Sequence, residues 1–211
     1  MSFGAGLPKI ATGLGALWLV AGFMPFGAAW PDDSSASPRP DWTVEQLVAR
    51  LKEQREPAVF FEEKTYSSLL IEPLSAKGVL RFVPPATLEK EIIEPHRERY
   101  LIDGDLILFE SAKKGIKKTI ALDDYPALRS LVEAFRASVT GDAARLLHYY
   151  ETTIGGDRRR WTLLLRPRES EGKRIVDYIL LTGTDGRIET VAIRAPDGDR
   201  SVMTLRRGPL P

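Results

Sequence analysis

The stretch GVLRFVPPATLEKEIIEPHRERYLIDGDLILFE, residues 78–110, decides the fold. Short runs rich in β-branched and aromatic residues alternate in it with turn residues, a pattern typical of strands. Pro84 and Pro85 end the first run, and Asp103-Gly104 predicts a hairpin because glycine readily adopts a positive φ. Tight turns join antiparallel neighbours. We therefore expect antiparallel strands at residues 78–83, 87–93, 99–102 and 105–110.

The same strand pattern continues on both sides of this stretch. Upstream, residues 58–64 form one further apolar and aromatic run. Downstream, Asp185-Gly186 and Asp197-Gly198 again predict hairpins. The downstream strands that we expect are Trp161–Arg166, Val176–Thr182, Ile188–Arg194 and Ser201–Arg206.

Two segments have helical spacing instead. Thr43 with Gln46 fits a capping box, and Val44, Leu47, Val48 and Leu51 then recur on one side. Between the strand groups, Pro126 can begin a helix that carries Leu128, Leu131, Val132 and Phe135, and Gly141-Asp142 ends it before a short helix at residues 143–150. A large antiparallel sheet needs a cover on one face. We therefore predict an α+β fold in which the N-terminal helix and the helical insertion cover the concave side of a curved antiparallel sheet.

The N-terminus predicts export. Lys9 precedes the apolar segment IATGLGALWLVAGFMPFGAA, residues 10–29, and Gly27 and Ala29 are small residues before a cleavage point near Trp30. This order predicts a signal peptide over residues 1–29, and hence a periplasmic protein. A retained membrane anchor is the alternative, although the uninterrupted apolar run is short for a span. Residues 30–41 are a polar, proline-rich linker, so the folded domain should cover residues 42–211.

Charge and cysteine content exclude several classes of function. Lys9 is the one charged residue of the predicted signal peptide, so 29 of the 30 Lys and Arg residues remain beside 29 acidic residues. This balance gives no general attraction to nucleic acid. The chain has no cysteine, which excludes disulfides, thiolate metal sites and a cysteine nucleophile. It also excludes a lipid anchor on a cysteine at the cleavage point.

A search for catalytic patterns finds none. His96 and His148 lack the spacing of a metal site, and no serine lies in a G-x-S-x-G sequence. Glu62 and Glu63 are adjacent on a strand and point to opposite faces. The run 158–160, three arginines, suits either an anionic group or a polar turn. We therefore expect no enzyme, no metal and no cofactor.

Several of these motifs resemble the LolA family of periplasmic carriers of outer-membrane lipoproteins. The resemblance covers residues 43–206, and its motifs are Phe61, Glu63 and Lys64 at a strand end, the G-x-L-x-F sequence of Gly78, Leu80 and Phe82, Pro85 with Leu88, and Pro95 before Asp103-Gly104. Residues 125–168 look like the helical insertion and next strand of a LolA-related subgroup. The family has an Arg immediately before the loop proline, whereas this chain has Pro84, so gating and cargo are open questions.

The resemblance implies an incomplete β-barrel whose helices form a lid over acyl chains. Strand alternation groups apolar residues into faces but does not separate a ligand cavity from an ordinary core. Taken together with the resemblance to the family, this alternation predicts the residues of the cavity, which are Leu80, Phe82, Leu88, Leu106, Leu108, Leu163, Leu165, Ile179 and Leu181. The expected lid residues are Leu131, Phe135 and Leu147. Phe61 is either a cavity or a core residue.

This interpretation predicts a carrier of lipoprotein acyl chains or a related lipid, moving toward the outer membrane. An inner-membrane exporter and an outer-membrane acceptor are its expected partners. Two alternatives remain open: a carrier of another lipid or pigment, and a non-transporting envelope module with a filled core.

Overall fold

The computed structural model describes residues 42–84 and 87–208. The predicted signal peptide and linker, residues 1–41, lie outside the described residues. The helices are α2 (Val44–Glu53), α3 (Pro126–Thr140), α4 (Ala143–Tyr149) and α5 (Ser170–Ile175), with a 3₁₀ turn at Leu122–Asp124. The strands are β1 (Ala58–Tyr66), β2 (Leu74–Val83), β3 (Thr87–Glu94), β4 (Glu98–Asp103), β5 (Leu106–Ser111), β6 (Ile116–Ala121), β7 (Tyr150–Gly156), β8 (Trp161–Pro167), β9 (Tyr178–Thr184), β10 (Arg187–Arg194) and β11 (Arg200–Arg206).

All eleven strands form one antiparallel sheet in the order β6-β5-β4-β3-β2-β1-β11-β10-β9-β8-β7. The two ends of the order are β6 and β7, and the sheet does not close into a barrel. At its centre β1 pairs with β11, for example Glu63 opposite Met203. The first and last strands of the domain therefore join two hairpin meanders into one curved sheet, as the α+β prediction required.

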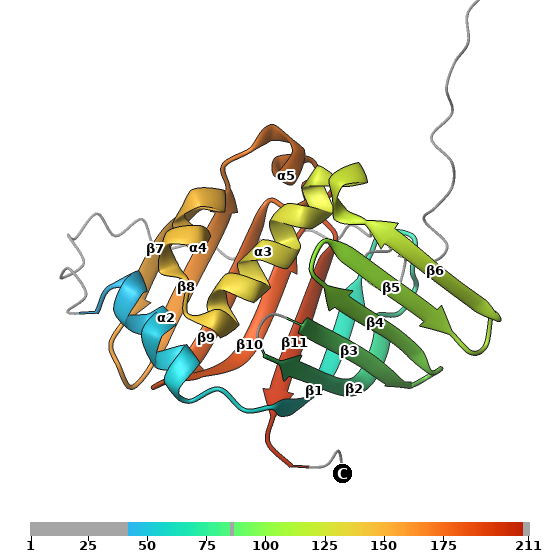
Figure 1. Cartoon of the computed structure of the whole chain (residues 1–211), viewed down its shortest axis with the longest axis horizontal. Coiled ribbons are helices and arrows are strands. Elements are labelled where there is room, and N and C mark those ends of the chain that lie inside the picture. The colour runs from blue at the N-terminus through green and yellow to red at the C-terminus, as the bar shows by residue number, and fades with distance from the viewer. Residues whose placement is uncertain (1–41, 85–86, 209–211) are drawn as a thin grey trace, which may run out of the picture.

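The helices cover one face of this sheet (Figure 1). The figure shows α3 crossing the middle of the sheet, with α2 and α4 beside it over β7–β9. Packing contacts join α3 to α2, α4 and α5. The main core lies between helices and sheet, with Leu47 and Leu146 from the helices and Phe61 and Trp161 from the sheet all fully buried. None of the described helices is both long and apolar enough to cross a membrane.

Local sequence signals explain where the helices begin and end. Thr43 and Gln46 form the reciprocal capping box at the start of α2. Pro126 occupies the first turn of α3, where its missing N–H costs nothing. Gly141 ends α3 in the left-handed conformation with φ of 81°, a conformation that glycine adopts without steric cost.

Three elements were not predicted from the sequence. Strands β6 and β7 and helix α5 have no counterpart among the expected elements, and β7 begins at Tyr150, the last residue of the expected short helix. Both β6 and β7 lie at the edges of the sheet. An edge strand has a partner on one side only, so its sequence needs less regular apolar alternation.

Candidate functional site

A cavity of about 570 Å³ lies between the concave face of the sheet and the covering helices. This volume falls in the range of about 300–1,000 Å³ that is usual for small-molecule sites. Its walls are largely apolar. From the sheet they include Val59, Leu80, Phe82, Leu88, Ile102 and Ile107, and from the helices Leu51, Leu128, Leu131, Val132 and Phe135.

The strand register explains why these side chains face the same space. Leu80 of β2 pairs with Val59 of β1 and with Lys90 of β3, so the three side chains lie on one face. In the next row Phe82 pairs with Leu88, and Leu88 pairs with Ile102. Because residues two apart along a strand share a face, consecutive rows build a continuous apolar wall.

Five of the expected residues line this cavity: Leu80, Phe82, Leu88, Leu131 and Phe135. Leu165, Ile179 and Leu181 instead contact a small void of about 30 Å³, which shares Phe135 with the main cavity. Leu163 is fully buried in the core and lines neither space. Phe61 is fully buried in the core cluster as well.

The face expected for β5 is corrected by the structure. Leu106 is half exposed, and neither Leu106 nor Leu108 lines the cavity. Their neighbour Ile107 lines it instead, because Ile107 pairs with Ile102 on the concave side. Leu147 of α4 is partly buried but does not line the cavity either, whereas Leu146 is fully buried.

The sequence interpretation missed a charged pair in the cavity wall. Lys90 Nζ lies 2.6 Å from Glu63 Oε2, and the two side chains are 13% and 8% exposed. The Ser201 hydroxyl donates to Glu63 Oε1 at 2.6 Å. Both Lys90 and Glu63 line the cavity. The available signal was alternation, since Leu88, Lys90 and Ile92 share one strand face.

An arginine ties the end of α3 to the cavity mouth. Arg55, just after α2, donates from Nη1 to the main-chain oxygen of Val139 at 2.8 Å. Its guanidinium lies 4.1 Å from the centroid of the Phe82 ring. Pro84, which stands where the family has an arginine, is an exposed turn residue. Arg55 therefore joins the segment after α2 to the last turn of α3.

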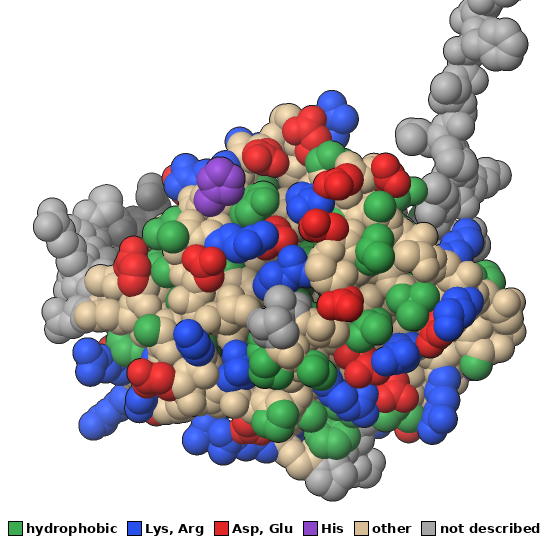
Figure 2. Space-filling view, viewed as in Figure 1, with side chains coloured by type: hydrophobic (Ala, Val, Ile, Leu, Met, Phe, Trp, Pro, Cys, Tyr) green, Lys and Arg blue, Asp and Glu red, His purple; other side chains and the backbone are tan. Residues whose placement is uncertain are grey.

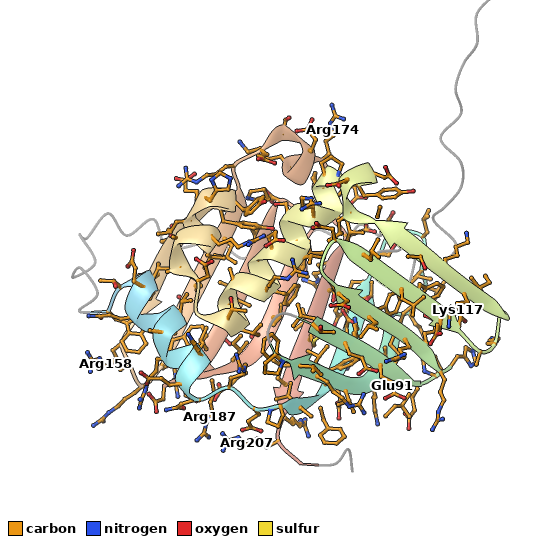
Figure 3. All side chains as sticks on the ribbon, in the orientation of Figure 1. Glu91, Lys117, Arg158, Arg174, Arg187 and Arg207 are labelled. Atoms are coloured by element: carbon orange, nitrogen blue, oxygen red, sulfur yellow. The ribbon has the colours of Figure 1, made fainter. Side chains whose placement is uncertain are left out.

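Charged side chains surround the same end of the cavity. Arg187, Arg206 and Arg207 line it, and Arg207 forms an ion pair with Glu56. Figure 3 shows Arg187 and Arg207 pointing away from the body of the molecule at this end. In Figure 2, apolar side chains lie beside Lys and Arg side chains over the lower part of the helix-covered face. The cavity thus has an apolar interior and a charged rim.

The remaining candidates for chemistry have ordinary structural contacts. His96 Nε2 lies 2.7 Å from Lys113 Nζ, and the ring of His148 packs edge-on against Tyr149. Arg158 lies over the Trp42 ring, 5.4 Å from its centroid. Within residues 42–84 and 87–208 there is no group of acidic, histidine or cysteine side chains that could hold a metal ion.

The described residues therefore form an open, curved antiparallel sheet with a largely apolar cavity beneath its helices. Over residues 35–208 the sequence matches the family described as outer membrane lipoprotein carrier protein LolA-like. The chain belongs to this family. Among curated proteins, no sequence matches it.

The solved structures to which this chain is similar have low sequence identity to it. A LolA superfamily protein from Nitrosomonas europaea is 12% identical, with 81% of this chain and 96% of that chain covered at a TM-score of 0.43. A putative outer membrane lipoprotein-sorting protein domain from Vibrio parahaemolyticus is 11% identical, with coverages of 79% and 93% and a TM-score of 0.42. The Mycobacterium tuberculosis lipoprotein LppX is 12% identical, with coverages of 80% and 99% and a TM-score of 0.41.

Proposed function

We propose that this protein is a lipid carrier of the cell envelope, which holds the acyl chain of a lipoprotein or a related lipid in the cavity beneath α3. The observation that supports this most directly is the cavity itself, a space of about 570 Å³ with mostly aliphatic and aromatic walls. A module with a filled core has no reason to keep such a space, because voids in a core cost stability. Family membership supports the same function.

The free energy of transfer from water explains how such a site retains its cargo. Each methylene group buried from water contributes about 0.8 kcal/mol. One water occupies about 30 Å³ of liquid, so the cavity holds on the order of twenty groups of that size, comparable with one long acyl chain. Release then requires only that the covering helices move, with no bond made or broken. We accordingly propose a binding role without catalysis.

The proposed route follows from the family and from the apolar N-terminal segment. The chain would be exported to the periplasm, take lipid from a donor at the inner membrane, and pass it to an acceptor at the outer membrane.

Lipid extraction from the purified protein tests the carrier function. After gentle purification from the periplasm, native mass spectrometry should find the wild-type chain with a bound acyl lipid. Leu88→Glu places a charge in the cavity wall and should remove this lipid. Leu106→Glu is the matched control, because Leu106 is half exposed and does not line the cavity. Wild-type protein without lipid, or equal loading of both variants, would contradict the proposal.

A further inference from the structure

An ion pair in the wall of an apolar cavity needs a physical reason. Lys90 and Glu63 are both largely buried, and their charged atoms lie 2.6 Å apart. Removing two charges from water costs several kcal/mol per ion, and an aliphatic pair of similar volume is often no less stable. Stability alone therefore gives little reason for a charged pair among the leucines of the wall.

The two partners differ in how much of their hydrogen-bonding capacity is filled. Glu63 accepts from Lys90 at one carboxylate oxygen and from Ser201 at the other. An ammonium carries three donors. Among the described residues, Glu63 provides the one oxygen that accepts a hydrogen bond from Lys90, and the centroid of the Phe61 ring lies 5.1 Å from Lys90 Nζ. Lys90 therefore has donor capacity left over on a cavity wall where the neighbouring side chains, Leu80 and Tyr100, offer it no carboxylate.

The net charge of the Lys90–Glu63 pair determines which kind of acceptor the remaining donors of Lys90 favour. Glu63 neutralises Lys90, so the pair has no net charge to attract an anion. A carboxylate beside Lys90 would also approach Glu63, and like charges repel strongly where water is excluded. A neutral carbonyl oxygen avoids this repulsion and still accepts a charge-assisted hydrogen bond, which is stronger than a bond between neutral groups.

We propose that Lys90, held by Glu63, is a recognition site for the neutral ester or amide carbonyl of an acyl lipid. The inference rests on the proposed carrier function and specifies the ligand class of the same cavity. The preferred cargo is then an acylated molecule whose carbonyl enters the cavity with its chain, in preference to a free fatty acid or a pure hydrocarbon.

Competition between three probes of equal chain length tests the proposal. Methyl palmitate, palmitate and hexadecane are compared at pH 7.5 by displacement of 1-N-phenylnaphthylamine from the delipidated full-length protein. The wild-type chain should bind methyl palmitate about tenfold or more tightly than hexadecane, as expected for a hydrogen bond to a charged donor. Palmitate should bind more weakly than its methyl ester.

Substitutions at the pair separate recognition from folding. The double variant Glu63→Gln/Lys90→Met removes both charges and should lose the preference for the ester while keeping its affinity for hexadecane. Lys90→Arg keeps the charged donors and should keep the preference. Lys64→Met is the matched control, because Lys64 is exposed and alternation directs it to the opposite face of β1.

The other possible outcomes contradict either the role of Lys90, the preference for a neutral acceptor, or the carrier function. An unchanged ester preference in the double variant, or none in the wild type, overturns the role of Lys90. Tighter binding of palmitate than of its ester overturns the preference for a neutral acceptor. If the wild-type chain binds none of the three probes, the carrier function itself is wrong, and the inference falls with it.

Discussion

The guanidinium of Arg55 and the carbonyl of Val139 join the mouth of the cavity to the last turn of α3 through a hydrogen bond of 2.8 Å. A helix end leaves its last four carbonyl groups without partners inside the helix. Arg55 satisfies one of them and packs on the Phe82 ring at the same time. The end of the covering helix is therefore held by a side chain that also forms part of the cavity wall.

Replacing Arg55 should loosen the end of α3. Arg55→Met keeps much of the length of the side chain but removes the donor, at a net cost of about 1 kcal/mol. Amide exchange of residues 136–141 should become about fivefold faster, measured by hydrogen–deuterium exchange with mass spectrometry. Arg50→Met is the control, because its partners Glu53 and Asp185 lie outside α3. Equal exchange in wild type and Arg55→Met would refute this role.

Glu133 should be essential for the stability of the helical layer. It is completely buried on α3 and accepts hydrogen bonds from Arg136 at 2.9 Å and from Arg145 of α4. Arg136 also donates to the carbonyl of Gly104 at 2.7 Å, which connects α3 to the β4–β5 hairpin. Glu133→Gln leaves a buried guanidinium without its counterion, and such losses cost about 3–5 kcal/mol. Urea unfolding should report this decrease.

Two comparison variants test the cause of that loss. The double variant Glu133→Leu/Arg136→Met removes both buried charges and should recover part of the free energy of unfolding. Glu45→Gln, on the exposed face of α2, should change it by less than about 0.5 kcal/mol. If Glu133→Gln were as harmless as Glu45→Gln, the buried pair would not contribute to stability.

The sequence predicted the strands and helices well where local chemistry decides them. The capping residues Thr43 and Gln46, the break at Gly141 and the hairpin at Asp103-Gly104 all lie where we expected. These features depend on a few neighbouring residues. Strand β6, with sequence IKKTIA, was missed because an exposed edge strand tolerates consecutive lysines on both faces.

The cavity was harder to predict because β5 carries apolar residues on both of its faces. In the sequence LILF, Leu106 and Leu108 alternate with Ile107 and Phe109, so periodicity alone cannot select the inner face. Tertiary packing selects the inner face: the rings of Phe109 and Tyr100 pack against each other on the concave side, with centroids 4.8 Å apart and planes tilted by 32°. The Lys90–Glu63 pair was missed because its partners are far apart in the sequence and meet only through β2.

A side chain at Gly78 should lower the stability of the protein. A Cβ atom at this position would lie 1.9 Å from the carbonyl oxygen of Glu91 and 2.8 Å from the Phe61 ring. Gly78→Ala must therefore displace β3, where the register between β2 and β3 already shifts. We expect a loss of about 1–3 kcal/mol in thermal or urea unfolding. Gly155→Ala, which meets only the Thr162 hydroxyl, is the control and should lose less.

Tyr150 should make the protein less stable in alkaline solution. Its phenol is fully buried and accepts a hydrogen bond from the Ser130 hydroxyl at 3.3 Å, and burial raises its pKa from 10.0 to about 12. Below pH 10 the folded and unfolded states both keep the proton, so the contribution of Tyr150 is fully present. Between pH 10 and 12 only the unfolded state releases it, which lowers the free energy of unfolding by up to about 3 kcal/mol.

Urea unfolding at pH 9 and pH 11.5 measures this effect. The wild-type chain should lose more free energy of unfolding between the two pH values than Tyr150→Phe, which has no phenolic proton to release. Equal losses in the two proteins would show that Tyr150 does not contribute to the alkaline transition.

The two outer strands, β6 and β7, each pair on one side only, and this has a mechanical consequence. The segment that contains α3 and α4 runs from β6 to β7, the two opposite margins of the sheet. A closed barrel has a circumference set by its ring of hydrogen bonds, whereas an open sheet can flatten or bend while every backbone ladder stays intact. An open sheet of this kind lets the space beneath the helices widen or narrow, and the segment that contains α3 and α4 limits how far the two margins can spread.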